Sequence, residues 1–383
     1  MKKGFIVFIV IVLAGFIHLN AQKKKDGYKF NEVVTVKTTP VKDQARSGTC
    51  WSFAAISFIE TELLRMGKGE YDLSEMFNVR MAYPEKAELY IRLHGKTQFS
   101  AGGQAHDVMN VFREYGAVPE KVYPGIQYGK DEHNHSELDA VLQGMLKALL
   151  KIKKRTYTTV WKAAVEAVLD TYLGTVPQEF EFKGKTYTPK SFAESLGLNP
   201  DNYIEITSYT HHPFYTKFIL EIPDNWSDDY YYNLPLEELM KVIDHALKNG
   251  YSVAWDGDVS EETFKYRKNL ALIIPDDWDD MTDEEQEAVF EKPVEEKEIT
   301  QEMRQKTFNN MSTTDDHLMH LTGMVKDQTG TIYYRTKNSW GSESNEWEGF
   351  FNMSGSFVKL KTVAIMVHKD AVPEDIRKKL ELK

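Results

Sequence analysis

The stretch that decides the fold covers residues 44–54 and reads Gln-Ala-Arg-Ser-Gly-Thr-Cys-Trp-Ser-Phe-Ala. Cys50 is the single cysteine of the 383-residue chain, so an intramolecular disulfide and a cysteine-based zinc site are excluded. Apolar residues then recur at helical spacing up to Leu63 without Gly or Pro, which predicts a buried helix over residues 50–65. A lone cysteine is most often a small buried hydrophobic residue, so its neighbours must decide whether it is a nucleophile.

The neighbours favour a reactive thiol. A helix N-terminus presents unpaired backbone N–H groups and the positive end of the helix dipole, and both favour the thiolate. Gly48 lets a substrate backbone come close, and Gln44, six positions before Cys50, can direct an amide N–H at an oxyanion beside the sulfur. Cys50 is therefore a candidate nucleophile, and Gln44 is a candidate oxyanion donor.

Two further motifs lie far downstream. Residues 316–323 read Asp-His-Leu-Met-His-Leu-Thr-Gly, and residues 338–341 read Asn-Ser-Trp-Gly. Together with Gln44 and the Cys-Trp pair, and in this order along the chain, they resemble the motifs of the papain-like cysteine peptidases. The Gly-Gly-Gln sequence at residues 102–104 and the Tyr-Gly-Ala-Val-Pro sequence at residues 115–119 resemble the bleomycin hydrolase and aminopeptidase C branch of that family.

The resemblance implies a peptidase that uses a Cys-His-Asn triad. Cys50 attacks the carbonyl carbon, His317 moves the proton, and Asn338 fixes the imidazole ring. The resemblance also assigns the remaining site residues: Gln44 and the backbone N–H of Cys50 bind the oxyanion, Trp340 covers the bond between Asn338 and His317, and Gly102, Gly103 and Asp316 bind the substrate. No cofactor and no metal is expected.

His320 is the rival of His317 for the role of base. Two residues three positions apart on a strand point to opposite faces of the sheet, so both cannot face Cys50. The family pattern, in which a methionine follows two positions after the histidine, favours His317.

Other residues raise the question of a metal site. The pairs His133 with His135 and His211 with His212 are alternatives as ligands, but there is no His-Glu-x-x-His motif, so exposed loop histidines are expected. Residues 276–298 contain twelve acidic residues against two lysines. They lack the alternating carboxylates and central glycine of a calcium loop, which predicts a solvated surface insertion.

The order of elements indicates an α+β fold with a cleft between its halves. A papain-like fold has a helical left half that carries the nucleophile helix and a β-barrel-like right half, here with helical insertions. Helices are expected over residues 50–65, 105–115, 136–152, 161–173 and 235–248, a hairpin over 179–188, and strands over 251–255, 318–325, 331–336, 349–353 and 363–367. The peptidase domain is expected over residues 22–383, with a helical insertion at about 131–200 and an acidic insertion at about 275–300.

The start of the chain predicts export through a signal peptide over residues 1–21. Lys2 and Lys3 precede an apolar run over residues 4–17, which is short for a membrane span and is followed by Ala21, a small residue suited to cleavage. We expect a periplasmic or secreted protein without stable membrane insertion, and an uncleaved anchor is the alternative. The net charge of −11 argues against a nucleic-acid partner.

The resemblance also implies how the activity is restricted. The 28 residues between Ala21 and Cys50 are too few for an inhibitory propeptide, and the bleomycin hydrolase branch forms hexameric barrels whose C-terminal arm limits cleavage to free N-termini. Here the chain ends at Lys383, where relatives continue for a further arm. We expect an aminopeptidase acting on peptides, with residues 380–383 near the cleft; an endopeptidase with an open cleft and a catalytically silent peptide-binding relative remain alternatives. Residues 136–152 carry an apolar stripe that is either core or subunit contact: Leu138, Val141, Leu142, Met145 and Leu149.

Overall fold

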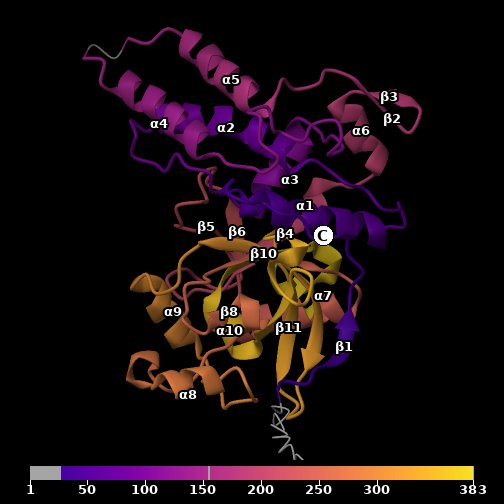
Figure 1. Cartoon of the computed structure of the whole chain (residues 1–383), viewed down its shortest axis with the longest axis vertical. Coiled ribbons are helices and arrows are strands. Elements are labelled where there is room, and N and C mark those ends of the chain that lie inside the picture. Colours follow the sequence, from indigo (N-terminus) through magenta and orange to yellow (C-terminus); the bar gives the residue numbers. More distant parts are fainter. Residues whose placement is uncertain (1–26, 154–155, 383) are drawn as a thin grey trace, which may run out of the picture.

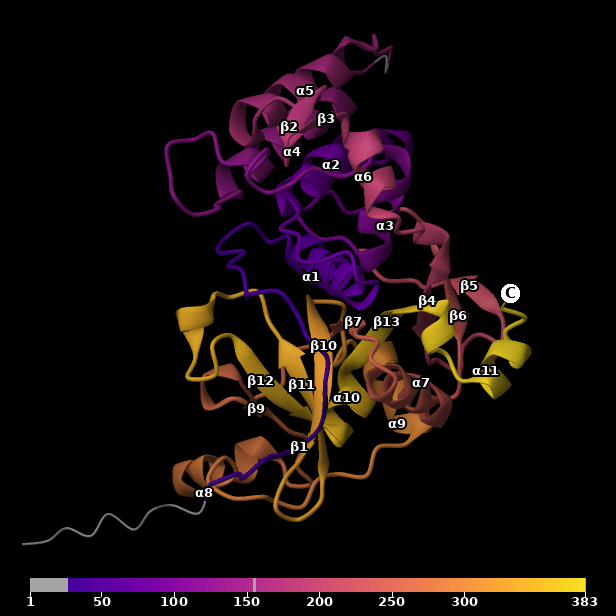
Figure 2. The same ribbon diagram turned by 90° about the vertical axis from the view of Figure 1, so that its right-hand side faces the viewer.

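The computed structural model describes residues 27–153 and 156–382, and the predicted signal peptide lies outside them. Within this part of the chain, no helix combines the length and the apolar character needed to cross a bilayer. Figures 1 and 2 show a helical layer stacked on a large sheet, with further helices around the sheet.

The helical layer contains the nucleophile helix and the predicted helical insertion (Figure 1). Its helices are α1 (Cys50–Arg65), α2 (Glu75–Arg92), α3 (Ala105–Glu114), α4 (Ser136–Leu150), α5 (Val160–Leu173) and α6 (Pro189–Leu196). A separate hairpin, β2 (Phe180–Phe182) with β3 (Lys185–Tyr187), lies beside α6 and matches the predicted turn at residues 183–184. Side chains of all six helices belong to one hydrophobic core.

Eleven strands of the described chain form one mixed sheet in the order β5-β6-β4-β13-β7-β10-β11-β12-β9-β8, and β1 also pairs with β10. The strands are β1 (Asn31–Thr35), β4 (Tyr203–Thr207), β5 (Lys217–Ile219), β6 (Tyr230–Asn233), β7 (Val253–Gly257), β8 (Phe264–Lys265), β9 (Leu270–Ala271), β10 (His317–Lys326), β11 (Ile332–Lys337), β12 (Phe350–Ser354) and β13 (Thr362–His368). The remaining helices are α7 (Leu236–Lys248), α8 (Asp283–Ala288), α9 (Gln301–Asn309), α10 (Gly355–Lys361) and α11 (Glu374–Lys379).

Helix α1 lies between the two layers, as Figure 2 shows, and is buried on nearly every side. It contacts α2 and α3 in the helical layer and β7 and β10 in the sheet. A helix that is apolar all round belongs in such an interior position. Gly48, just before α1, has a φ of +68°, and a Cβ there would lie 2.9 Å from Ala101 Cβ. Glycine therefore lets the loop before Cys50 pack against residues 101–103.

The apolar stripe of α4 is intramolecular core. Leu138, Leu142 and Leu146 are fully buried at a spacing of one helical turn, and they share a core with α5. Val141, which the sequence placed on the stripe, is instead 37% exposed. The buried leucines are four positions apart, whereas Val141 is three positions after Leu138 and therefore lies at the edge of the buried row.

The acidic insertion is exposed over most of its length and contains the short helix α8. A capping box begins this helix: Thr282 N donates to Glu285 Oε2 at 2.8 Å, and Glu285 N donates to Thr282 Oγ1 at 3.3 Å. Glu296 departs from this surface character because it is half-buried and accepts a hydrogen bond from Ile273 N at 3.3 Å.

Candidate active site

Cys50 is the first residue of α1, and its half-buried thiol lies at the start of β10. The backbone of Leu318 interacts with the thiol. Because Leu318 directly follows His317, the first residue of β10, the predicted nucleophile and base come from the starting points of two adjacent elements. Asp224 and Asp256 are also close enough to act electrostatically on the thiol.

His317 and Asn338 are joined by a hydrogen bond of 2.8 Å between His317 Nε2 and Asn338 Oδ1. The same oxygen accepts the N–H of Ser339 at 2.8 Å, which identifies it as the acceptor and assigns the imidazole proton to Nε2. The indole of Trp340 stacks on the imidazole with the ring centroids 5.0 Å apart. His317 and Asn338 are both buried, so the bond is shielded from water and Nδ1 is the nitrogen left to accept a proton.

Burial sets the protonation of the two reactive groups. It raises the pKa of the Cys50 thiol to about 12, and Asp224 and Asp256 act in the same direction. It lowers the pKa of His317 to about 4, which the bond to Asn338 offsets in part. Desolvation thus opposes the expected thiolate in the substrate-free structure, whereas the helix N-terminus favours it.

Gln44 is held by the Asn-Ser-Trp-Gly motif. Its side-chain oxygen accepts a hydrogen bond from Ser339 Oγ at 2.6 Å, and its backbone N–H donates to Ser339 O at 2.8 Å. The adjacent residue Asp43 forms a β-bridge with Trp340. The amide oxygen of Gln44 is thus occupied, which leaves its side-chain N–H groups for the predicted role as donors to an oxyanion.

His320 faces a different environment from His317. Its Nδ1 lies 2.9 Å from Ser57 Oγ on the inner side of α1, and the ring is completely buried. Burial lowers the pKa of His320 well below its usual range, and Lys337 adds to the effect. This geometry favours His317 as the base.

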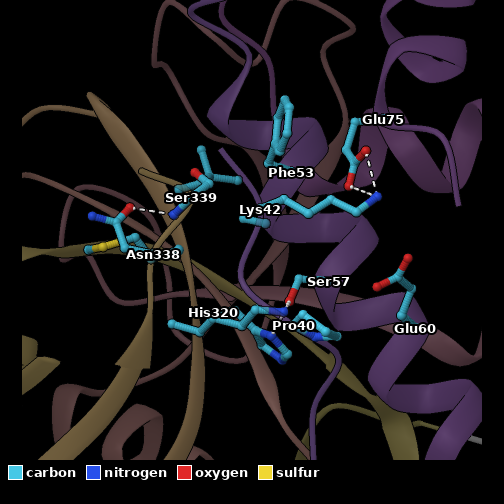
Figure 3. Close-up of a pocket in the computed structure, with 13 residues that line it drawn as sticks. Pro40, Lys42, Phe53, Ser57, Glu60, Glu75, His320, Asn338 and Ser339 are labelled. Atoms are coloured by element: carbon cyan, nitrogen blue, oxygen red, sulfur yellow. Dashed lines mark hydrogen bonds and ion pairs between the residues drawn. The ribbon is translucent and has the colours of Figure 1, made fainter. Parts of the chain in front are cut away.

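A small cavity of about 20 Å³ lies beneath the site, between α1 and strands β10 and β11 (Figure 3). Its wall includes Asn338 and His320; among the described residues, Asn338 Nδ2 and His320 Nε2 are buried without a hydrogen-bond partner. Lys337, also in the wall, donates to Ser57 Oγ at 2.8 Å. The cavity is large enough for one water molecule, and its wall combines polar and apolar side chains.

The predicted substrate strip lies beside α1. Trp51 Nε1 donates to Ala101 O at 2.8 Å and ties the strip to the nucleophile helix. A Cβ on Gly102 would collide with the carboxylate of Asp224, and a Cβ on Gly103 would lie 2.8 Å from Asp107. Both positions therefore require glycine.

Asp316, the third residue assigned to substrate binding, is exposed next to His317. Its carboxylate accepts the backbone N–H of Val259 at 3.0 Å, which ties the residue to the loop after β7. Sequence reasoning singled out Asp316 and passed over its neighbour Asp315.

The histidine pairs differ from each other. His135 is completely buried, and neither ring nitrogen has a hydrogen-bond partner among the described residues, so the expectation of an exposed loop histidine is wrong there. Burial lowers the pKa of His135 to about 4. His211 and His212 are accessible, and both bond to Glu221, at 3.0 and 2.8 Å; the three ligand atoms lie within 4.8 Å of one another.

The carboxyl-terminal segment lies away from the site. Leu380 is buried in the sheet-side core, and Glu381 and Leu382 line a cavity of about 520 Å³ whose wall includes neither Cys50 nor His317. The expectation that this segment approaches the cleft is wrong for residues 380–382. Lys383 lies outside the described residues.

Comparison with known proteins identifies the family of the chain. Residues 90–383 match the model of the Peptidase C1-like family. The chain belongs to this family. It is similar to aminopeptidase C of Lactococcus lactis subsp. cremoris, with 25% identity over 378 residues that cover 88% of this chain and 82% of the relative. It is also similar to the mitochondrial cysteine proteinase 1 of Saccharomyces cerevisiae, with 22% identity over 406 residues that cover 93% and 80%.

A solved structure confirms the predicted α+β, papain-like fold. PepW from Lactobacillus rhamnosis superposes with a TM-score of 0.69 and 19% identity, over 92% of this chain and 84% of that one. As a member of the Peptidase C1-like family, the chain is a cysteine-type peptidase that hydrolyses peptide bonds.

Proposed function

We propose that the chain is an aminopeptidase that removes residues from the amino end of peptides through Cys50, His317 and Asn338. The observation that carries the triad is the bond of 2.8 Å between His317 and Asn338 beneath Trp340, at the point where α1 presents Cys50. The names of the relatives, aminopeptidase C and aminopeptidase G among them, support cleavage from the amino end.

The proposed mechanism starts from a neutral thiol and a neutral imidazole. As the sulfur of Cys50 attacks the carbonyl carbon, the thiol proton passes to His317 Nδ1 and an S–C bond forms. The imidazolium then gives this proton to the leaving amine as the C–N bond breaks. Water attacks the thioester with His317 as base, which releases the acid and restores the thiol. Asn338 keeps the ring in one orientation throughout.

The oxyanion of each tetrahedral intermediate is held by two donors, the side-chain amide of Gln44 and the backbone N–H of Cys50. Ser339 fixes Gln44 before the substrate arrives, so little reorganisation is needed during the reaction. Loss of one such donor typically costs about 3 kcal/mol of transition-state stabilisation. Gln44→Ala therefore lowers kcat by roughly 100-fold with little change in KM.

The catalytic assignment is tested by labelling and by two variants. An epoxide inhibitor of thiol peptidases adds its mass to the wild-type protein and to a His212→Ala control, and Cys50→Ala abolishes the addition. Cys50→Ala and His317→Ala each lower the turnover of a peptide amide by orders of magnitude, while thermal melting shows intact folds. More than a few per cent of activity in Cys50→Ala contradicts the mechanism.

Exopeptidase action and assembly are tested together. Two fluorogenic peptides that differ only in acetylation of the N-terminus are assayed beside sedimentation of the protein. The proposal expects faster cleavage of the free peptide and, from the family resemblance, a homo-oligomer. Equal or faster cleavage of the acetylated peptide by a monomer identifies an endopeptidase instead.

We also propose export with cleavage after Ala21, which rests on the charged and apolar pattern of residues 1–21. N-terminal sequencing of the protein from its native host is expected to begin at Gln22 or to be blocked by cyclisation of that glutamine. Recovery of soluble, cytoplasmic protein with Met1 intact contradicts export.

A further inference from the structure

Three carboxyl groups, here called the acidic cluster, come from separate segments of the chain: Asp224 between β5 and β6, Asp256 on β7, and Asp315 just before β10. Asp315 Oδ2 accepts the backbone N–H of Asp224 at 3.0 Å, which joins the two loops. Asp315 acts electrostatically on both other members, and Asp224 and Asp256 act on the thiol of Cys50. The cluster is therefore part of the surroundings of the nucleophile.

Asp256 is the unusual member. It is 3% exposed, and both of its carboxylate oxygens lack a hydrogen-bond partner among the described residues. Side chains alternate along β7: Trp255 packs in the sheet-side core, whereas Ala254 packs in the core that contains α1, and Asp256 shares the face of Ala254. Its carboxyl group therefore points toward α1. The neighbour that can donate to Asp256 is the side-chain amide of Gln104, whose nitrogen has no other partner among the described residues; its hydrogen bonding lowers the pKa of Asp256 and offsets part of the effect of burial.

The described residues supply little positive charge to the acidic cluster. No lysine or arginine among them forms an ion pair with any of its three members. Lys86 acts on Asp224 from α2, but its ammonium donates to Ser100 O at 2.7 Å and to Gly102 O. Asp107 and Glu205 also lie near Asp224 and Asp256, and His106 is 2.6 Å from Glu205. Burial lowers the pKa of His106, but Glu205 and Asp107 raise it to about 9, so the charge of this imidazolium is already paired with these two carboxylates.

Burial raises the pKa of Asp224 to about 7, that of Asp315 to about 6 and that of Asp256 well above its ordinary value, and Asp315 adds to the effect on the other two. An ammonium group beside these carboxyl groups favours their ionised form and lowers the pKa values again.

The acidic cluster also touches the substrate strip. The Asp224 carboxylate lies so close to Gly102 that a Cβ there would collide with both of its oxygens. Gln98 Nε2 donates to Asp224 Oδ1 at 2.6 Å and holds the carboxylate in this place. If a peptide binds along Gly102 and Gly103 with the carbonyl of its first residue at Cys50, its amino end lies near the acidic cluster.

We propose that the acidic cluster binds the primary ammonium group at the amino end of the substrate and thereby limits cleavage to the first peptide bond. The inference rests on the proposed aminopeptidase function. It assigns the selection of free N-termini to side chains inside the molecule rather than to the carboxyl-terminal segment, of which Leu380 is buried in the sheet-side core and Glu381 and Leu382 line a different cavity. A lysine side chain next to the cleaved residue offers the same ammonium chemistry, so the test must separate the two sources.

Three fluorogenic amides with the same cleaved residue make this separation. The first has a free α-amino group, and the second is acetylated at that group. The third carries a lysine residue before the cleaved residue; the α-amino group of this lysine is acetylated and its side-chain ammonium is free. Asp224→Asn and Asp256→Asn are compared with Asp228→Asn, an exposed control on the loop of Asp224 whose φ of +57° suits asparagine. Both cluster variants are expected to lower kcat/KM for the free amine by about 30-fold or more, with less than threefold change for the acetylated amide and none in the control.

The outcomes are distinguishable from failure of the proposed function. An equal loss on all three substrates overturns the inference, because the cluster then acts only on the thiol or on folding. The inference is also overturned if the wild type cleaves the lysine substrate faster than the free-amine substrate and the cluster variants lose this preference. The cluster then binds a lysine side chain of the substrate rather than its amino end. Absence of both turnover and epoxide labelling in the wild type overturns the proposed function itself.

A measurement on the wild type covers the case in which a variant fails to fold. Leucine amide and N-acetyl leucine amide are compared as competitive inhibitors, since they differ only in the ammonium group. The inference expects the free amine to bind at least about tenfold more tightly. Equal inhibition by the two compounds overturns it.

Discussion

Replacement of Asn338 by alanine provides a quantitative test of the site. The substitution leaves the buried Nε2–H of His317 without its acceptor at 2.8 Å, beneath the ring of Trp340. Leaving a buried donor unpaired costs about 1–3 kcal/mol, and the imidazole also loses its fixed orientation. If this cost falls on the reacting state, kcat/KM drops roughly 5- to 150-fold.

Asn338→Asp separates orientation from charge, because the two side chains have nearly the same shape. A carboxylate beside His317 stabilises the imidazolium and raises the pKa of His317 from its value of about 4. Catalysis needs the neutral imidazole as base, so activity is lost as pH falls through this pKa. Raising the pKa therefore moves the acid limb of the rate profile to higher pH.

The assay is kcat/KM for a fluorogenic amide across pH, with thermal melting to confirm folding. Asn309→Ala is the matched control, since Asn309 is exposed at the end of α9. An unchanged rate in Asn338→Ala, or an unmoved acid limb in Asn338→Asp, would refute the role assigned to Asn338.

Three further expectations follow from buried groups. With the pKa of Cys50 at about 12 and that of His317 at about 4, the alkylation rate of substrate-free Cys50 is expected to rise with pH up to the alkaline range. An alkylation rate that stays constant from acidic to neutral pH would reveal a thiolate–imidazolium ion pair instead. His320→Gln lowers the free energy of unfolding by about 1–3 kcal/mol, measured by urea titration, and leaves the acid limb in place. Burial raises the pKa of Glu296 from 4.5 to about 7, so as pH rises the unfolded state releases this proton first, and the free energy of unfolding of the wild type falls between these pH values. Glu296→Gln lacks this proton, so its free energy of unfolding relative to wild type increases on the order of 2–3 kcal/mol over that range. Parallel curves of unfolding free energy against pH for the two proteins, measured by urea titration, contradict the reasoning.

Local pattern was sufficient to predict the elements that carry the site. Helix α1 begins at Cys50 as expected, and β10, β11 and α3 lie within a residue or two of the predicted bounds. Their apolar periodicity is strong because each packs in a core. The proposed triad residues stand at or next to the ends of these elements, so the predicted elements together with a family resemblance were enough to nominate them.

Helix α2 was not predicted because its stability comes from distant contacts. Pro84 lies inside it, and polar residues interrupt its apolar face. Arg80 bonds to Asp170 on α5 at 2.8 Å, and Lys86 donates to backbone carbonyls of the substrate strip. Partners that lie many residues away in the sequence are invisible to local periodicity.

The acidic cluster was missed for a related reason. Its three members stand on separate segments that only the fold brings together. The available signal was Asp256 itself, a charged residue directly after the apolar run of β7. The protonation of Cys50 was likewise beyond sequence reasoning, since desolvation depends on how deeply the tertiary structure covers the helix N-terminus.

The acidic cluster and the neutral Cys50–His317 pair make opposite demands on Asp224. Its carboxylate raises the pKa of the Cys50 thiol, so in the free protein it opposes the formation of the nucleophile. An ammonium group beside Asp224 cancels that effect, so a substrate with a free amino end would relieve the restraint as it binds. Asp224→Asn should therefore speed alkylation of substrate-free Cys50 at alkaline pH while it slows turnover of the free-amine substrate. Changes of the same sign in both rates would show that Asp224 acts only through the thiol.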